Sequence, residues 1–123
     1  MTALTIVLPW PDSGLSPNAR KHWAAKGKVT RTARLEAYYL TRAAMGKATD
    51  WKPSDIPVVE TVLSPPDNRR RDLDNMIAAG KAARDGIADA IGVDDSLWQL
   101  RFRRGEAVRG GKVTITISGK DAA

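Results

Sequence analysis

Four short apolar runs, interrupted by two stretches of helical periodicity, constrain the fold of this 123-residue chain more than any other feature. Each run is rich in β-branched residues or alternates apolar with polar residues, and each is bounded by turn-forming residues. The predicted strands cover residues 4–8, 57–63, 97–103 and 112–118. The order strand, helix, strand, helix, strand, strand predicts an α+β domain, a mixed sheet with helices packed on it.

The two helical stretches lie between the first three strands. The first covers residues 19–46, where apolar residues recur at helical spacing in the second half. The second covers residues 75–91 and is followed by Gly92, a typical C-terminal stop. The pair Gly110-Gly111 predicts a hairpin turn into the last strand. A chain of this length fits one compact domain over residues 1–123.

The composition excludes several classes of site. Because the chain has no cysteine, disulfide frameworks, zinc ribbons and thiol nucleophiles are excluded. Its one histidine, His22, cannot form a multi-histidine metal site, so any bound metal must be held mainly by oxygen. No apolar run approaches the roughly 20 residues of a membrane-spanning helix, and the first ten residues lack the pattern of a signal peptide. We therefore expect a cytoplasmic protein without a membrane partner.

Basic residues are concentrated towards the two ends of the chain. The formal net charge is +6, but residues 51–100 carry six Lys/Arg against nine Asp/Glu, a net charge of −3. An acidic centre between basic ends suits an enzyme that holds phosphates at its periphery and cations at its centre. An uneven but fully solvated surface explains the same distribution equally well, so the charges by themselves leave the choice open.

The most informative segment precedes the second helix and reads Arg69-Arg70-Arg71-Asp72-Leu73-Asp74-Asn75. Two carboxylates two residues apart share a face on an extended segment but diverge on a helix, so Asp72 and Asp74 converge only if the helix begins after them. Asp74 is a good N-cap for a helix beginning at Asn75, which favours this boundary. Unless one carboxyl is protonated, their repulsion favours a bound cation, and Mg2+ suits carboxylate and phosphate oxygens together.

A second acidic pair, Asp94-Asp95, follows the second helix and could complete the metal site. The pair lies roughly 25 Å from the start of the helix, at about 1.5 Å per residue along the axis. It can reach Asp72 and Asp74 only if the chain doubles back, or if a second subunit supplies it. Of Asp94 and Asp95, we expect one to bind the metal and the other to face solvent.

Lys81 lies on nearly the same face of the second helix as Asp74, and helical side chains lean towards the N-terminus. Its ammonium group could therefore point back at the aspartates and stabilise negative charge in the transition state of phosphodiester cleavage. The alternative is an exposed ion pair with Asp85, four residues later.

Two groups of arginines are candidates for contacts with DNA phosphates. Arg69, Arg70 and Arg71 are either phosphate clamps beside the scissile bond or a solvated charged turn. The same two interpretations apply to the second group, which consists of Arg101, Arg103 and Arg104. Trp98 and Phe102 alternate with these arginines and favour core positions over base stacking.

At these residues the chain resembles the RusA family of crossover-junction endodeoxyribonucleases, found in bacteria and their phages. The resemblance covers nearly the whole chain, from Leu8-Pro9-Trp10-Pro11 through residues 69–75 to Asp94-Asp95 and the glycine pair at 110–111. It implies a RusA-like endonuclease domain that acts as a homodimer and resolves Holliday (four-way) junctions with magnesium, by symmetric paired nicks. By the same resemblance Asp72, Asp74 and Asp95 would be the metal ligands.

The chain departs from the family's pattern at one position. The best-known members have a lysine one turn into the helix, where this chain has Ala78, and Lys81 lies one turn later. Either Lys81 takes over this role or the protein does without it. Two other functions could use the same residues: a general metal-dependent nuclease acting on flaps or other branched DNA, and a non-catalytic basic DNA-binding module in which the aspartates balance the arginines.

Overall fold

The structure, a computed structural model, describes residues 3–17 and 23–120, so the predicted helical residues 19–22 lie outside it. The strands are β1 (Ala3–Pro9), β2 (Val58–Ser64), β3 (Gln99–Arg104) and β4 (Lys112–Ser118). The helices are α1 (Trp23–Lys47), α2 (Leu73–Ala79) and α3 (Lys81–Ile91), with short 3-10 helices η1 (Ser13–Leu15) and η2 (Asp95–Leu97). The predicted α+β class and element order are confirmed. No helix in the described part is long and apolar enough to cross a membrane.

The four strands form one mixed sheet in the order β1-β4-β2-β3. β4 is antiparallel to β1 and β2, whereas β3 is parallel to β2. The predicted hairpin between the last two strands is therefore wrong, because β2 lies between them. Gly110 and Gly111 do turn the chain, with φ angles of 79° and 71°. Residues 105–111 cross the end of β2, where Val108 N donates to Pro65 O at 2.9 Å.

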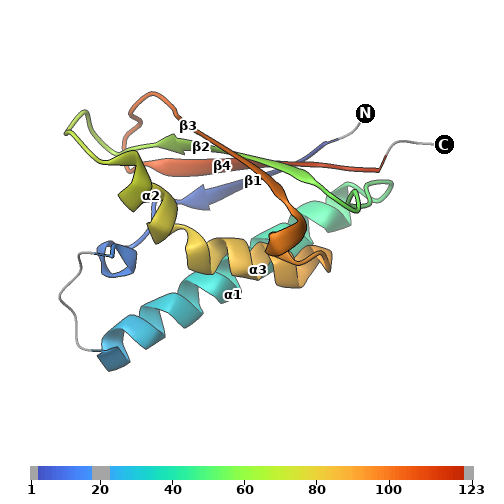
Figure 1. The fold of residues 1–123 in the computed structure, drawn as a ribbon, viewed down its shortest axis with the longest axis horizontal. Helices are drawn as coiled ribbons and strands as arrows, with labels where there is room; N and C mark the ends of the chain where they lie inside the picture. The colour runs from blue at the N-terminus through green and yellow to red at the C-terminus, as the bar shows by residue number, and fades with distance from the viewer. Residues whose placement is uncertain (1–2, 18–22, 121–123) are drawn as a thin grey trace.

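The helices cover one face of the sheet, as Figure 1 shows. Apolar side chains on this face alternate along each strand and pair across the sheet, for example Ile6 with Ile115 and Val59 with Ile117. Val59 and Ile117 are fully buried, as is Ile87 of α3. Burial of each such side chain contributes about 1.5–3 kcal/mol, so these contacts hold α3 against the sheet. No described helix covers the other face of the sheet.

The second predicted helix differs from the structure at its start and in its middle. It begins at Leu73, two residues earlier than predicted, with Asp72 as the N-cap residue but no hydrogen bond to the Asp72 side chain. The predicted N-cap, Asp74, therefore lies inside the first turn. At Gly80 the backbone tightens (φ −89°, ψ 0°) and Gly80 N donates to Ile77 O, which divides the helix into α2 and α3.

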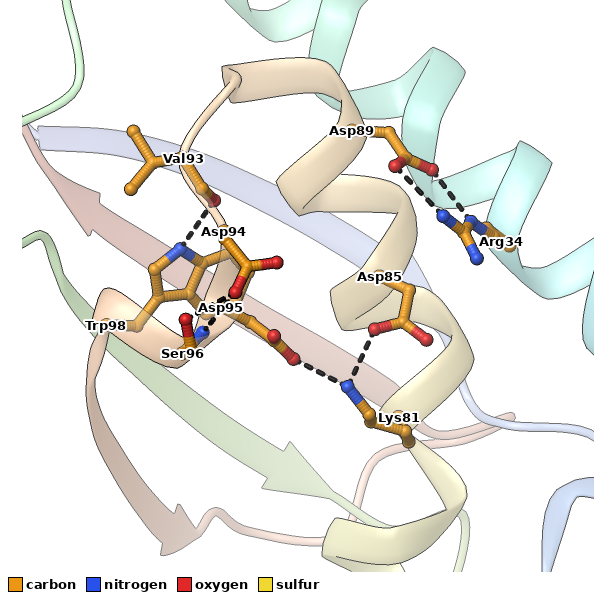
Figure 2. Close-up of polar contacts among 9 residues, drawn as sticks. All are labelled: Arg34, Lys81, Asp85, Asp89, Val93, Asp94, Asp95, Ser96 and Trp98. Atoms are coloured by element: carbon orange, nitrogen blue, oxygen red, sulfur yellow. Dashed lines mark hydrogen bonds and ion pairs between the residues drawn. The ribbon is translucent and has the colours of Figure 1, made fainter.

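The backbones of α1 and α3 approach closely at Gly86. A Cβ atom at this position would lie 2.1 Å from the carbonyl oxygen of Arg34. Only glycine permits this approach, because every other residue would place an atom in the space that α1 occupies. One turn later Arg34 Nε and Nη2 donate to the Asp89 carboxylate at 2.7 and 3.0 Å (Figure 2). The crossing fixes the position of α3, and with it that of the charged residues along this helix.

Candidate active site

The chain doubles back after α3. Asp95 lies in η2, and its Oδ2 accepts a hydrogen bond of 2.6 Å from Lys81 Nζ at the start of α3. Figure 2 shows the two side chains reaching towards each other between the helix and the η2 turn. The contact forms within a single chain and brings Asp95 back to the start of α3, while the expected approach of the acidic pair to Asp72 and Asp74 stays a prediction.

Lys81 bonds two carboxylates at once, and we refer to Lys81, Asp85 and Asp95 as the Lys81 cluster. Lys81 Nζ donates to Asp85 Oδ1 at 2.7 Å, so the predicted pair four residues apart exists beside the contact with Asp95. The bonds to Asp85 and Asp95 raise the pKa of the ammonium group above its ordinary value. The Lys81 side chain is 57% exposed, so water screens both pairs and they add little stability. The ammonium group is therefore charged and partly exposed to solvent.

The two aspartates of the acidic pair have different environments. Asp94 is the N-cap of η2, where its Oδ2 accepts hydrogen bonds from the backbone N of Ser96, at 3.1 Å, and from the Ser96 hydroxyl. These bonds, the hydroxyl first, lower the pKa of the Asp94 carboxyl below its ordinary value. Trp98 Nε1 closes the same turn by donating to Val93 O at 3.0 Å. Asp94 thus stabilises the turn, and Asp95 is the better candidate for a metal ligand.

Asp72 and Asp74 are exposed at the N-terminal end of α2. Because Asp72 is extended and Asp74 is helical, the predicted extended face that they would share does not form. Among residues 3–17 and 23–120, no group of three or more carboxylate or histidine side chains is placed to hold a metal ion. Magnesium often uses only one or two protein carboxylates together with substrate phosphates and water. The chemistry of two exposed aspartates therefore fits this ion.

The run of three arginines divides into one anchored and two exposed side chains. Arg71 Nη1 donates to Asp67 Oδ1 at 2.8 Å, and the Arg71 guanidinium lies 5.8 Å from the centre of the Trp10 ring. The Arg71 side chain is only 15% exposed, so it holds the loop before α2 in place. Arg69 and Arg70 are exposed, so they are the members of the run that stay candidates for contacts with DNA phosphates.

The arginines of β3 point to opposite faces of the sheet. Arg104 lies on the helix-covered side at the end of the strand, and its Nη1 donates to Arg71 O at 2.9 Å. Arg101 and Arg103 alternate with it and point to the open face, where Arg103 lies 3.8 Å from Glu60. Two of the three therefore point away from the Lys81 cluster, and contact of these arginines with DNA phosphates stays a prediction.

A buried charged residue near the Lys81 cluster was missed in the sequence. Arg84 of α3 is 8% exposed, and its guanidinium lies 5.3 Å from the centre of the Phe102 ring. Burial lowers the pKa of Arg84, against the opposing effect of the two carboxylates of the cluster, and arginine remains protonated even so. Position 84 falls on one helical stripe with Ile87 and Ile91, which was the available sign that this arginine faces the core.

Comparison with the sequence patterns of known protein families gave no match. An uncharacterized protein of Xylella fastidiosa strain Temecula1 is 40% identical over 121 residues, which span 94% of this chain and 76% of the relative. The similarity thus extends over nearly the whole chain. The chain belongs to the same protein family as this Xylella fastidiosa protein.

Proposed function

We propose that the protein is a magnesium-dependent endodeoxyribonuclease that nicks branched DNA, with the four-way junction as its main substrate. The observation that carries the proposal is the return of Asp95 to Lys81. It joins the Lys81 ammonium group at the start of α3 to a carboxylate in η2, beyond the end of that helix, and Lys81 follows Asp74 by seven residues across the break at Gly80. Carboxylates that could hold a magnesium ion and an ammonium group that could contact a phosphate are thus available on the consecutive helices α2 and α3.

Asp72 and Asp74 would hold the magnesium ion, and by the resemblance to the RusA family Asp95 would be a further ligand, although the described structure does not group the three carboxylates. A bound magnesium ion polarises the scissile phosphate and activates water. The residues of the chain supply the remaining functions. Lys81 stabilises the negative charge that grows on the phosphate during cleavage, while Arg69 and Arg70 hold the neighbouring phosphates of the DNA strand. A DNA substrate would place the protein in the cytoplasm.

Two further points support the junction as the substrate. The segment at residues 69–75, followed by a helix and an aspartate pair, resembles the RusA family. A four-way junction also has two-fold symmetry, so paired nicks require two sites related by the same operation, and we propose a symmetric homodimer. A monomer that resolves junctions at full rate, as measured by sedimentation at the assay concentration, would rule the dimer out.

The experiment compares nicking of a synthetic four-way junction with nicking of a linear duplex of the same sequence, with and without magnesium. We expect magnesium-dependent nicks in the junction only. Asp72→Asn, Asp74→Asn and Asp95→Asn should each abolish nicking and leave junction binding intact or tighter, because each removes a ligand and a negative charge near the DNA. Asp55→Asn is the matched control, since Asp55 is 91% exposed and lies outside the candidate site.

Two outcomes would contradict the junction nuclease. Equal nicking of junction and duplex would indicate a general metal-dependent nuclease. Binding without cleavage at any magnesium concentration would indicate a non-catalytic basic module. One observation favours the non-catalytic module. Four aspartates are each paired with a lysine or arginine, namely Asp67, Asp85, Asp89 and Asp95.

A further inference from the structure

A cavity of about 390 Å³ lies between α1, the helix-covered face of the sheet and the junction of α2 with α3. Its volume is within the range of small-molecule sites, roughly 300–1,000 Å³. The walls are mainly apolar, with side chains from the sheet and the helices that include Leu8, Leu63, Met76, Ala83, Val113 and Ile115. The cavity is separate from the residues proposed for cleavage, because neither the three aspartates nor Lys81 lines it.

Arg84 contributes a positive charge to this apolar cavity. It lines the wall beside Gly80, where its Nη1 occupies the space that a Cβ atom would need, 2.9 Å away. Within the described part of the chain no carboxylate hydrogen-bonds to this guanidinium, and its contact is with the face of the Phe102 ring. A buried charge without a hydrogen-bonded counter-charge is costly, so the site favours an anion.

Thr61 adds an unsatisfied polar group to the same cavity. It lines the wall from β2, is 3% exposed, and its Oγ1 has no hydrogen-bond partner in the described part of the chain. Buried hydroxyl groups are almost always hydrogen-bonded, so an orphan beside a cavity indicates a missing partner. Asp12, Lys28 and Glu36 also line the cavity, but all three are exposed to solvent. Arg84 is therefore the only buried charged residue among the described residues that line the cavity.

We propose that this cavity binds a small organic carboxylate with an apolar body. The carboxylate lies against the Arg84 guanidinium, whose planar geometry matches it, and accepts a second hydrogen bond from Thr61. The apolar body packs against the aliphatic walls. One buried cation among mainly apolar walls favours a singly charged ligand, and the inference is independent of the proposed nuclease activity.

Calorimetric titration of the full chain with decanoate and with decanol tests the assignment, because the two probes share an alkyl chain and differ in charge. We expect one saturable site per chain and at least tenfold tighter binding of decanoate. Ala33→Leu fills the cavity from α1 and should abolish binding. Ala43→Leu, on the same helix but outside the cavity, is the matched control and should bind as the wild type does.

Arg84→Gln should abolish the preference for decanoate over decanol. If circular dichroism shows that this variant does not fold, titration of the Ala33→Leu and Ala43→Leu variants with decanoate and decanol still tests the proposed site. The assignment is overturned by the absence of saturable decanoate binding, by equal affinity for the two probes, or by an Ala33→Leu protein that binds decanoate normally.

Discussion

Replacement of Gly86 by alanine tests whether the α1 to α3 crossing holds the candidate site in place. The new Cβ atom would lie 2.1 Å from Arg34 O and 3.1 Å from Tyr38 N, whereas ordinary contact begins at 3.4 Å. Both neighbours are backbone atoms, so no side chain can rotate away. The two helices must therefore separate by more than about 1 Å, and overpacking of this kind costs typically 1–3 kcal/mol.

The expected change in the free energy of unfolding combines this cost with a gain. Because the neighbours are rigid, we take the upper end of the range, about 3 kcal/mol. Alanine is the better helix former by about 1 kcal/mol, which leaves a net loss of about 2 kcal/mol. For a domain of this size such a loss lowers Tm by roughly 6–10 °C.

Thermal and urea unfolding followed by circular dichroism provide the measurement. Gly46→Ala is the matched control, because Gly46 also lies in a helix and a Cβ atom there meets nothing within 4 Å. The control should gain up to about 1 kcal/mol from helix propensity alone. Equal stabilities of Gly86→Ala and Gly46→Ala would refute the close crossing of α1 and α3.

Three further predictions concern single side chains. Lys81→Ala should lower the single-turnover cleavage rate by roughly 10² to 10³ with little change in junction affinity. The control Asp85→Ala should leave the cleavage rate unchanged. A Lys81→Ala rate within about twofold of wild type would exclude a catalytic role of Lys81. Thr61→Val should raise the free energy of unfolding by about 1 kcal/mol, because it removes an unsatisfied hydroxyl. A lower free energy of unfolding in urea titration would show that the Thr61 hydroxyl is hydrogen-bonded after all. Hydrogen bonding by Arg34 lowers the pKa of Asp89 in the folded protein. The contribution of Asp89 to the free energy of unfolding is therefore present above the pKa of the unfolded state and is lost as pH falls through the pKa of the folded state. Stability curves between about pH 5 and pH 2 should therefore be flatter for Asp89→Asn than for wild type, and parallel curves would exclude the linkage.

The sequence specified the secondary structure better than the connections between strands. Alternation in residues 112–118 identified the side chains of β4 that face the core, and Val113, Ile115 and Ile117 are buried there. Alternation does not name the neighbouring strand, however. The glycine pair suggested a hairpin with β3, while the structure places β4 between β1 and β2. The pairing depends on which face the helices cover, and that is a property of the whole chain.

The candidate site was only partly predictable for a similar reason. The exposed positions of Asp72 and Asp74 follow from local charge, but the start of α2 was misplaced because Asp74 is as good a cap by composition as Asp72. The break at Gly80 accompanies packing of Arg84 over its backbone, a contact that local sequence cannot reveal. Alternation along β3 already placed Arg101 and Phe102 on opposite faces of the sheet. The separation of Arg101 from the Lys81 cluster could therefore have been predicted.

The central place of β4 in the sheet has a consequence for biosynthesis. β4 leaves the ribosome after the other three described strands, yet it supplies the hydrogen bonds that join β1 to β2. Until residues 112–118 emerge, β1 has no partner strand and the apolar face that it shares with β2 cannot close. Nascent chains halted before residue 112 should therefore remain sensitive to protease and dependent on chaperones, and commitment to the native state should follow the emergence of residues 112–118.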